Sequence, residues 1–514
     1  MRFFLVILFI LFSIQTIFGQ QNYLPLHSYY RDQILVTNRA ETYAGDCMFP
    51  ITEEEYNVYK YFKDSTVYYY EFPETIFKKH IIEVKDTDTY VKISPVIDFS
   101  YGKDLANQFK RNLFNNTRGF LAEVNLGKKI ALFTTFYENQ ALFSSYEADY
   151  YKSRGEFYTL YSKYTQENAV IPGAGRTKAF KDTKYDYAYA IGYVNYKISK
   201  DINVSLGNNQ HFIGAGYRSL LLSDNSYSSP YLQFDYKLNS KFKLHYWKSR
   251  NLNLVRKQHK TTVESYYQPK GNNGLYFSYQ INNKLNIGFF ESSIWMKGDS
   301  LNTSHLPIGS YNPVPILAIF FSDKQRYLLN GLNIDYVLNT LNRLYGQIVF
   351  GNLNFKNGGF QIGWRGNKQF KNKNILFQLE YNFVSHNVYQ SVNHQIDYSN
   401  YNLSLAHPAG NSFHELLFRS SSEFKRYYYD YKLITYFFNN RFNNFLLPVR
   451  LDSKQENFFQ VNNQIELGYR INKKLNWTVF LLNNFRFMSY ENIHLNSILQ
   501  IGMRTNLINH YNDF

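Results

Sequence analysis

The stretch Tyr236-Lys237-Leu238-Asn239-Ser240-Lys241-Phe242-Lys243-Leu244 decides the fold of this 514-residue chain. On each side of its polar centre, aromatic or aliphatic residues alternate with polar ones, which indicates two β-strands joined by a short turn. Three further copies of this pattern occupy 196–204, 279–287 and 469–477. Looser copies occur at 127–129, 339–342, 367–373 and 407–411.

Consecutive clear copies lie about 40 residues apart, enough for two strands of roughly ten residues with a short turn at one end and a longer loop at the other. A β-propeller has a similar repeat length, but its four-stranded blades would require more turns in each repeat. Eight short turns predict about 18 strands if both ends of the barrel face the periplasm. We therefore expect an all-β fold, a transmembrane antiparallel β-barrel spanning 91–514.

The alternation also assigns the two faces of the barrel wall. The face predicted to meet lipid carries Leu232, Phe234, Tyr236, Leu238, Phe242, Leu244, Tyr246, Ile465, Leu467, Tyr469, Ile471, Leu499, Ile501, Met503 and Leu507. The face predicted to line the lumen carries Gln233, Asp235, Lys237, Lys241, Lys243, His245, Gln464, Glu466, Arg470, Gln500, Arg504, Asn506, Glu123, Gln378, Glu380 and Asn382. Charged side chains are expected only on the second face, because a charge facing hydrocarbon is costly.

Composition agrees with an exported β-protein. Aromatic residues make up 19% of the chain, with 49 Tyr and 45 Phe, and Cys47 is the only cysteine, so no intrachain disulfide can form. The mean hydropathy of −0.43 argues against a helical membrane protein. The net charge of +16 suits anionic lipid or an acidic polymer as partner, or simply reflects Lys and Arg in turns and lumen. Export makes nucleic acid an improbable partner.

The first 90 residues differ from the rest of the chain. A secretory signal peptide is predicted over 1–19, because a positively charged start at Met1-Arg2 precedes the apolar run 3–12 and the segment closes at 17–19. Residues 20–90 do not alternate cleanly, and we expect a small helical cap or plug on the periplasmic side. One helix is predicted from a capping box at Thr52 through Asp64, another near Pro73, and a weak strand pair at 81–84 and 90–93.

One loop concentrates polar side chains that could bind a ligand. It runs from Gly207 to Asn225 between two alternating segments, and Gly207, Gly214 and Gly216 give its backbone room to turn. His211, Arg218, Asp224 and Asn225 could line a sugar-accepting surface, with Arg218 holding a uronic carboxylate through two hydrogen bonds. The structural alternative is that Arg218 pairs with Asp224 and merely holds the loop together.

Motifs for catalysis or metal binding are weak. The 12 histidines lack the local spacing of zinc ligands, and no Gly-x-Ser-x-Gly elbow is present. The glycine-rich run 172–178 lacks the Walker spacing of a phosphate loop. We therefore expect neither an enzyme nor a bound metal or cofactor.

The loop is also where the chain resembles a known family. Gly214-Ala215-Gly216 followed by Ser219-Leu220-Leu221-Leu222-Ser223-Asp224-Asn225 is similar to a segment of the Wzi-like capsule-assembly outer-membrane proteins, and closest to their Bacteroidetes branch with the RemB-like gliding-motility proteins. The resemblance implies a monomeric barrel of about 18 strands in the outer membrane, plugged by helices, that binds and organises surface or capsular polysaccharide. It also implies partners in motility or export machinery. His211-Phe212-Ile213 departs from the aromatic residues expected before the glycines.

These observations together predict a non-enzymatic outer-membrane barrel that holds surface polysaccharide. The leading alternative is a porin or a substrate-specific channel. A third class, an outer-membrane hydrolase, would require a catalytic Ser or His that the sequence does not reveal.

Overall fold

The computed structural model describes 22–37, 45–54, 66–106, 112–180, 184–256, 267–296, 326–352, 354, 356–370, 373–439, 446–449, 457–490 and 492–514. The predicted signal peptide and most of the helix predicted after Thr52 lie outside these residues. Thr52 itself forms a β-bridge with Tyr23. No helix within the described ranges has the length and apolarity needed to cross a bilayer.

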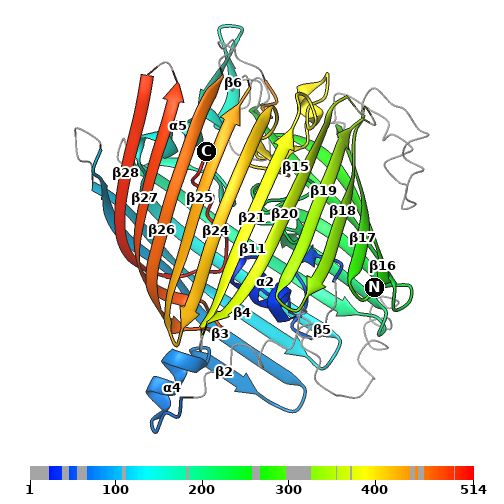
Figure 1. Ribbon diagram of the computed structural model, residues 1–514, viewed down its shortest axis with the longest axis vertical. Coiled ribbons are helices and arrows are strands. Elements are labelled where there is room, and N and C mark those ends of the chain that lie inside the picture. Colours follow the sequence, from blue (N-terminus) through cyan, green and yellow to red (C-terminus); the bar gives the residue numbers. More distant parts are fainter. Residues whose placement is uncertain are drawn as a thin grey trace, which may run out of the picture.

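Eighteen antiparallel strands of the described residues form one closed barrel, which confirms the predicted fold and strand number (Figure 1). The last strand pairs with the first, Ile501 opposite Tyr101, so this wall has no open edge. The strands of the wall are β3 (Thr89–Asp104), β4 (Asn112–Leu126), β5 (Ile130–Leu142), β11 (Lys184–Lys197), β12 (Ile202–Asn209), β14 (Ser229–Lys237), β15 (Phe242–Arg256), β16 (Tyr267–Asn282), β17 (Leu285–Met296), β18 (Arg326–Asn339), β19 (Asn342–Gly351), β20 (Gly358–Phe370), β21 (Lys373–Val384), β24 (Phe413–Phe424), β25 (Tyr427–Phe438), β26 (Phe458–Asn472), β27 (Trp477–Tyr490) and β28 (Asn492–Thr505).

The predicted short turns join strands at one rim of the barrel. All four clear copies and the looser copies at 127–129, 339–342 and 367–373 lie between consecutive strands there. The copy at 407–411 is not such a turn: these residues lie in a buried loop before β24, and the short turn that completes the set is 425–426. Pro, Gly and Asn indicate a chain reversal in either place, so composition alone did not separate them. We take the rim of short turns as periplasmic.

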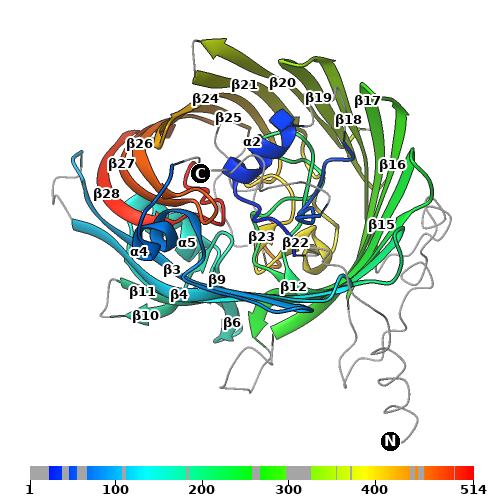
Figure 2. The same cartoon turned by 90° about the horizontal axis from the view of Figure 1, so that it is seen from below.

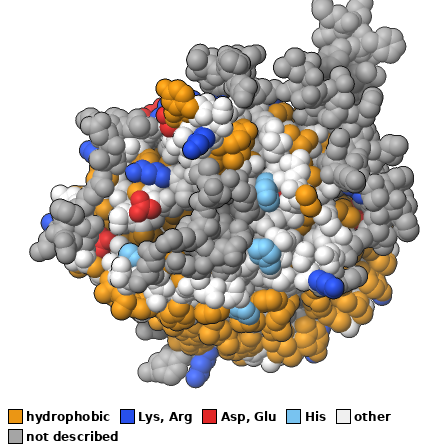
Figure 3. Space-filling view, turned by 90° about the horizontal axis from the view of Figure 1, so that it is seen from above, with side chains coloured by type: hydrophobic (Ala, Val, Ile, Leu, Met, Phe, Trp, Pro, Cys, Tyr) orange, Lys and Arg blue, Asp and Glu red, His pale blue; other side chains and the backbone are white. Residues whose placement is uncertain are grey.

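The two faces of the wall follow the predicted alternation. Leu232, Leu467 and Ile501 are 51%, 46% and 59% exposed, whereas Gln378 and Glu380 are fully buried inside. Seen from above, hydrophobic side chains gather along the outer wall (Figure 3). Leu507 was predicted to face lipid, which is wrong: β28 ends at Thr505, and Leu507 is buried beyond it. Lys241 was predicted to line the lumen, which is also wrong: it lies in the turn between β14 and β15 and is exposed.

Both ends of the described chain enter the barrel (Figure 2). The helix α2 (Ser28–Thr37) lies inside the lumen, and 506–514 turn back into it after β28, where the Phe514 ring stacks on Tyr150 at 3.6 Å between centroids. At the periplasmic rim are the helix α4 (Glu71–Lys78), near the predicted Pro73 helix, and the strand β2 (Ile82–Lys85), which pairs with β3 as predicted. The N-terminal region is therefore both an internal plug and a rim element.

The longest described outward connection, between β5 and β11, has secondary structure of its own. It contains α5 (Ser145–Ser153), β6 (Glu156–Leu160), β7 (Lys163–Glu167), β8 (Val170–Ile171), β9 (Gly175–Arg176) and β10 (Lys178–Phe180). Two other outward loops fold inward. They contain β13 (Phe212–Ile213), which pairs with β1 (Met48–Phe49), and the 3-10 helix η3 (His394–Ile396) with strands β22 (Ser399–Asn400) and β23 (Leu403–Ser404).

Candidate functional site: the plugged lumen and its cavity

The loop predicted to bind a ligand lies inside the barrel. After β12 it turns into the lumen, where β13 pairs with β1, and 210–226 are buried throughout. It packs against the second inward loop, since the hydroxyls of Tyr389 and Tyr398 donate to the carbonyls of Leu220 and Leu221 at 2.8 and 2.9 Å. The two loops together with α2 and the 506–514 segment form what we call the plug.

Two of the predicted glycines fit this path because a side chain would collide with the wall. Gly214 has a φ of +120°, and a Cβ there would lie 2.4 Å from Nε2 of Gln347. A Cβ on Gly216 would lie 2.8 Å from Oε2 of Glu380. The third, Gly207, is in β12, where a Cβ would approach the carbonyl oxygen of Gly192 at 2.3 Å.

Arg218 is 1% exposed and ties the loop to the barrel wall. Its Nε lies 3.1 Å from Oε1 of Glu415 on β24, and its Nη2 donates to the Tyr436 hydroxyl on β25 at 2.9 Å. The same nitrogen forms an ion pair with Asp513. The guanidinium that was predicted to bind a uronic carboxylate is therefore already paired with the carboxylates of Glu415 and Asp513.

Asp224 and Asn225 are also buried and bonded within the plug. Asp224 accepts hydrogen bonds from Asn509 Nδ2 at 2.7 Å and from the Tyr511 hydroxyl at 2.6 Å. Asn225 Nδ2 donates to the carbonyl of Ser404 at 3.1 Å. The structural alternative had assumed that Arg218 pairs with Asp224. They do not pair with each other, and each holds the loop through different partners.

His211 is 7% exposed among aromatic rings. Its ring meets Tyr231 edge-on at 4.9 Å and stacks on Trp247 at 6.2 Å. Burial lowers the pKa of this imidazole to about 4, so the ring is neutral at pH 7. The structure thus brings the four predicted side chains into the plug but gives them no common surface that a saccharide could reach, and this geometry favours the structural alternative.

A second set of ion pairs fixes α2 to the wall. Asp32 lies between two buried arginines, with Oδ1 2.6 Å from Arg365 Nη1 and Oδ2 2.7 Å from Arg419 Nη1. The backbone amide of Ser28 also donates to Asn509 Oδ1 at 2.9 Å, which joins α2 to the 506–514 segment. The plug is consequently linked to the wall and to itself by buried polar contacts.

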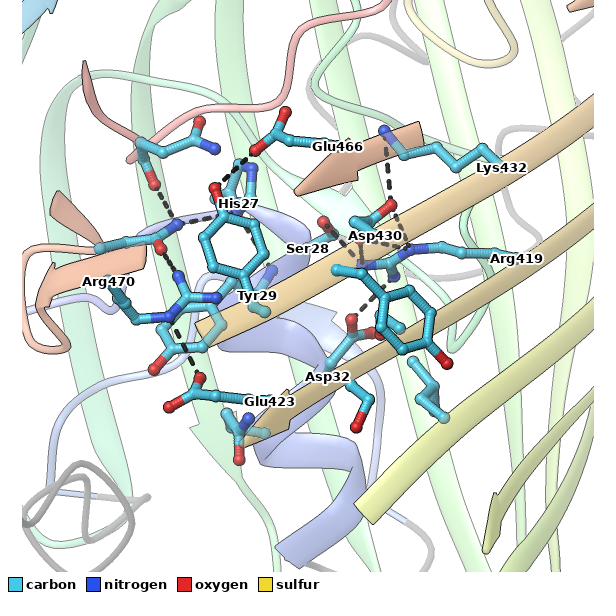
Figure 4. Close-up of a pocket in the computed structure, with 18 of the residues that line it drawn as sticks. His27, Ser28, Tyr29, Asp32, Arg419, Glu423, Asp430, Lys432, Glu466 and Arg470 are labelled. Carbon is cyan, nitrogen blue, oxygen red and sulfur yellow. Dashed lines mark hydrogen bonds and ion pairs between the residues drawn. The ribbon is translucent and has the colours of Figure 1, made fainter. Parts of the chain in front are cut away.

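Between the plug and the wall lies a cavity of about 390 Å³ (Figure 4). Its charged lining comprises Asp32, Arg419, Glu423, Lys425, Asp430, Lys432, Glu466, Arg470, Lys473 and Arg504. Alternation along β26 and β28 correctly predicted that Glu466, Arg470 and Arg504 face inward. Arg419 and Lys432 were missed. Lys432 stands between the apolar Tyr431 and Leu433, a signal that would have found it, whereas Arg419 stands between Phe418 and the polar Ser420, where alternation is less clear.

No metal-binding group is present among the side chains described, since none of their His, Cys, Asp and Glu residues gather in threes with the required spacing. The buried His407, for example, lies 2.8 Å from Glu415 through its Nε2, as part of the network around Arg218.

No family model and no curated protein sequence matches the chain. Among solved structures it is similar to Wzi from Escherichia coli, a carbohydrate-binding β-barrel involved in group 1 capsule assembly, with a TM-score of 0.57 and 13% identity over 95% of this chain and 100% of that one. OccAB4 from Acinetobacter baumannii has a TM-score of 0.42, with 10% identity over 81% of this chain and 98% of that one. A BenF-like porin from Pseudomonas fluorescens Pf-5 has a TM-score of 0.43, with 10% identity over 81% and 97%.

At this level of identity the likeness to Wzi shows the fold. It confirms the resemblance at the level of architecture, while the RemB-like branch remains an expectation. A closed antiparallel barrel with an apolar exterior and a polar, charged interior is the form that outer-membrane proteins take. The chain is an outer-membrane β-barrel.

Proposed function

We propose that this chain is a non-enzymatic outer-membrane barrel that binds surface polysaccharide and helps to hold or assemble it as a capsule. The observation that carries the proposal is the filled lumen: both inward loops, α2 and the 506–514 segment occupy the interior and bond to the wall. A diffusion channel needs a continuous aqueous path, which the described plug occupies. The likeness to Wzi, itself a carbohydrate-binding barrel, supports the same function.

The hairpin of β6 and β7 is the described outward surface best suited to a glycan (Figure 1). At its tip Tyr161 is 92% exposed, and Tyr164 beside it is 44% exposed. An exposed tyrosine ring offers an apolar face to a sugar and a hydroxyl for its polar groups. Tyr161 and Ser162 have φ of 46° and 65°, a turn conformation that Asn-Gly would adopt at lower cost. A large aromatic at a turn that disfavours it is consistent with a role for its ring.

The experiment compares the polysaccharide coat and the conductance of the same protein. Cells lacking the chain should lose surface polysaccharide, and wild-type protein should restore it, whereas Y161A/Y164A should restore it several-fold less. Tyr69 provides a matched control, because it is also 92% exposed but lies beside α4 at the periplasmic rim. Tyr69→Ala should therefore behave as wild type.

In planar bilayers the purified wild type should carry no steady open-channel current. A large current without ligand would favour the porin alternative and contradict the proposal. If Y161A/Y164A restores the full polysaccharide coat, the barrel still binds polysaccharide, but the β6–β7 hairpin is not its binding surface. A role in gliding is a further part of the proposal, tested by the spreading of cells that lack the chain on a surface.

A further inference from the structure

The cavity between plug and wall reaches the periplasmic rim. Its lining includes Lys425 and Lys473 in the short turns of that rim, and it extends inward to Tyr217 and Asn512 of the plug. A volume of about 390 Å³ falls within the range of small-molecule sites. The cavity is therefore large enough for a short segment of a ligand that arrives from the periplasm.

Charges in the cavity are mostly paired, with positive charge in excess. Four carboxylates face six cations, and the close pairs account for four of the cations. Arg419 Nη2 lies 2.6 Å from Asp430 Oδ2, and Arg470 Nε lies 3.1 Å from Glu423 Oε2 (Figure 4). Lys473 Nζ lies 2.5 Å from Glu423 Oε1, and Arg504 Nη2 lies 2.5 Å from Glu466 Oε2.

These pairs leave two cations, Lys425 and Lys432. Lys425 is exposed in the turn at the rim, so Lys432 is the one that lies inside the cavity. Its ammonium lies 3.9 Å from Asp430 Oδ1, beyond hydrogen-bond distance, and 5.6 Å from the centre of the Tyr217 ring. Asp430 is already engaged by Arg419 through two guanidinium nitrogens. The Nε of Arg504 also lacks a hydrogen-bond partner among the residues described.

Lys432, Arg419 and Arg504 lie close enough to His27 to act on its charge. Burial, followed by the charges of Arg504 and Lys432, lowers the pKa of His27 well below its ordinary value. His27 is therefore neutral at pH 7 and adds no charge of its own. An anion in the cavity would meet the ammonium of Lys432 and the guanidinium groups of Arg419 and Arg504.

The remaining lining suits a sugar. It is rich in amide and hydroxyl groups that both donate and accept hydrogen bonds, contributed by Gln33, Asn374, Ser421, Ser422, Gln464 and Asn512. Such groups match the hydroxyls of a saccharide, while Lys432 matches a carboxylate or a phosphate on it. An apolar ligand could make no hydrogen bonds to these groups.

We propose that this cavity is a periplasm-facing binding site for an acidic saccharide segment, whose carboxylate or phosphate pairs with Lys432. The biological meaning of the site rests on the proposed function, because a barrel that organises acidic surface polysaccharide would meet its ligand during export as well as on the cell surface. The binding itself can be measured independently of that function.

The test uses purified full-length barrel in detergent and titration calorimetry with trigalacturonate, with neutral maltotriose as the uncharged comparison. Wild type should bind trigalacturonate at least about tenfold more tightly than maltotriose, and less tightly as salt is raised. Lys432→Gln should weaken trigalacturonate binding about tenfold or more. Lys241→Gln, at an exposed turn of the same rim outside the cavity, should leave it unchanged.

A second variant guards against misfolding of the first. Gln464→Glu adds a negative charge to the lining without removing any cation, and it should also weaken trigalacturonate binding. Equal affinity in wild type, Lys432→Gln and Gln464→Glu, or equal affinity for maltotriose, would overturn the proposal. Competition with glucose 1-phosphate then identifies the preferred anion: displacement at lower concentration than trigalacturonate assigns phosphate, and the reverse assigns carboxylate.

The two proposals can fail separately. Coat retention by wild-type cells together with no binding of trigalacturonate or glucose 1-phosphate to the purified barrel would remove the cavity site and leave the surface role. Binding that depends on Lys432 in a protein whose loss does not change the coat would remove the surface role and leave the cavity site.

Discussion

Replacing Arg218 with Met tests whether this residue holds the plug or binds a ligand. The substitution keeps most of the side-chain volume but removes the guanidinium from a site where Arg218 is 1% exposed and Glu415 is fully buried. Removal of one partner of a buried ion pair costs about 3–5 kcal/mol. Glu415 keeps His407 at 2.8 Å and Asn382 at 2.6 Å, so we expect the lower end, about 3 kcal/mol.

A cost of about 3 kcal/mol raises the population of the open loop by roughly 100-fold. Hydrogen exchange of the backbone amides in 212–225, followed by mass spectrometry, should therefore be faster in R218M by a similar factor. Arg250, an exposed arginine of β15, gives the control Arg250→Met, which should exchange as wild type. The double variant R218M/E415Q should recover part of the protection, because Glu415 is then no longer a buried carboxylate without its arginine, while Asp513 keeps the Tyr436 hydroxyl at 2.8 Å.

The result that would refute this reasoning is unchanged exchange in R218M together with loss of saccharide binding. Arg218 would then act on the ligand, as the sequence had suggested, and its bonds to Glu415 and Tyr436 would be incidental.

Three further predictions concern other parts of the molecule. Gly214→Ala should speed the same exchange by at least tenfold, because the backbone has a φ of +120° and the new Cβ meets Gln347; Gly192→Ala, whose added Cβ would meet its nearest atom at an ordinary 3.5 Å, is the control. Since burial lowers the pKa of His211 to about 4, the stability it contributes is complete above pH 6.5 and is lost as pH falls from 6.5 towards 4; after correction for the slower intrinsic exchange at low pH, the protection of the same amides should decrease from pH 7 to pH 5 and 4, and less so in His211→Phe. Ile362→Lys places a charge on the 62% exposed outward face of β20 and should cost about 2–4 kcal/mol in urea unfolding from lipid vesicles, whereas Val392→Lys, fully exposed outside the strands, should cost little.

The barrel wall could be predicted from sequence because its pattern is local. Each strand carries its own alternation, as in Leu232-Gln233-Phe234, and each periplasmic turn follows within a few residues, so a short window contains all the necessary information. The prediction of a short rim turn at 407–411, which is wrong, shows the limit of this reasoning. A Pro-Gly-Asn cluster indicates a reversal of the chain, but whether that reversal lies at a rim or in the lumen depends on what fills the lumen.

The plug could not be predicted in the same way, because its contacts are between distant residues. Arg218 and its partner Asp513 are 295 positions apart in the sequence, and Asp32 and its partner Arg419 are 387 positions apart. The polar content of the loop pointed to a site of importance, and its glycines to a tight path, but a buried charge network and an exposed binding surface use the same residue types. Only the three-dimensional position of Glu415 next to Arg218 shows that this residue belongs to a buried charge network and not to an exposed binding surface.

The same network sets an energetic condition on transport. Opening the lumen would require at least the pairs of Arg218 and Asp32 to separate, each at about 3–5 kcal/mol if their partners stay buried, or about 6–10 kcal/mol together. A ligand shifts such an equilibrium only by its preference for the open state, and micromolar binding amounts to about 8 kcal/mol in total. A ligand of that affinity would therefore have to bind the open state almost exclusively. A saccharide that occupies the cavity with the plug in place meets no such requirement, which is why binding to the closed barrel, rather than passage through it, is the function that these pairings favour.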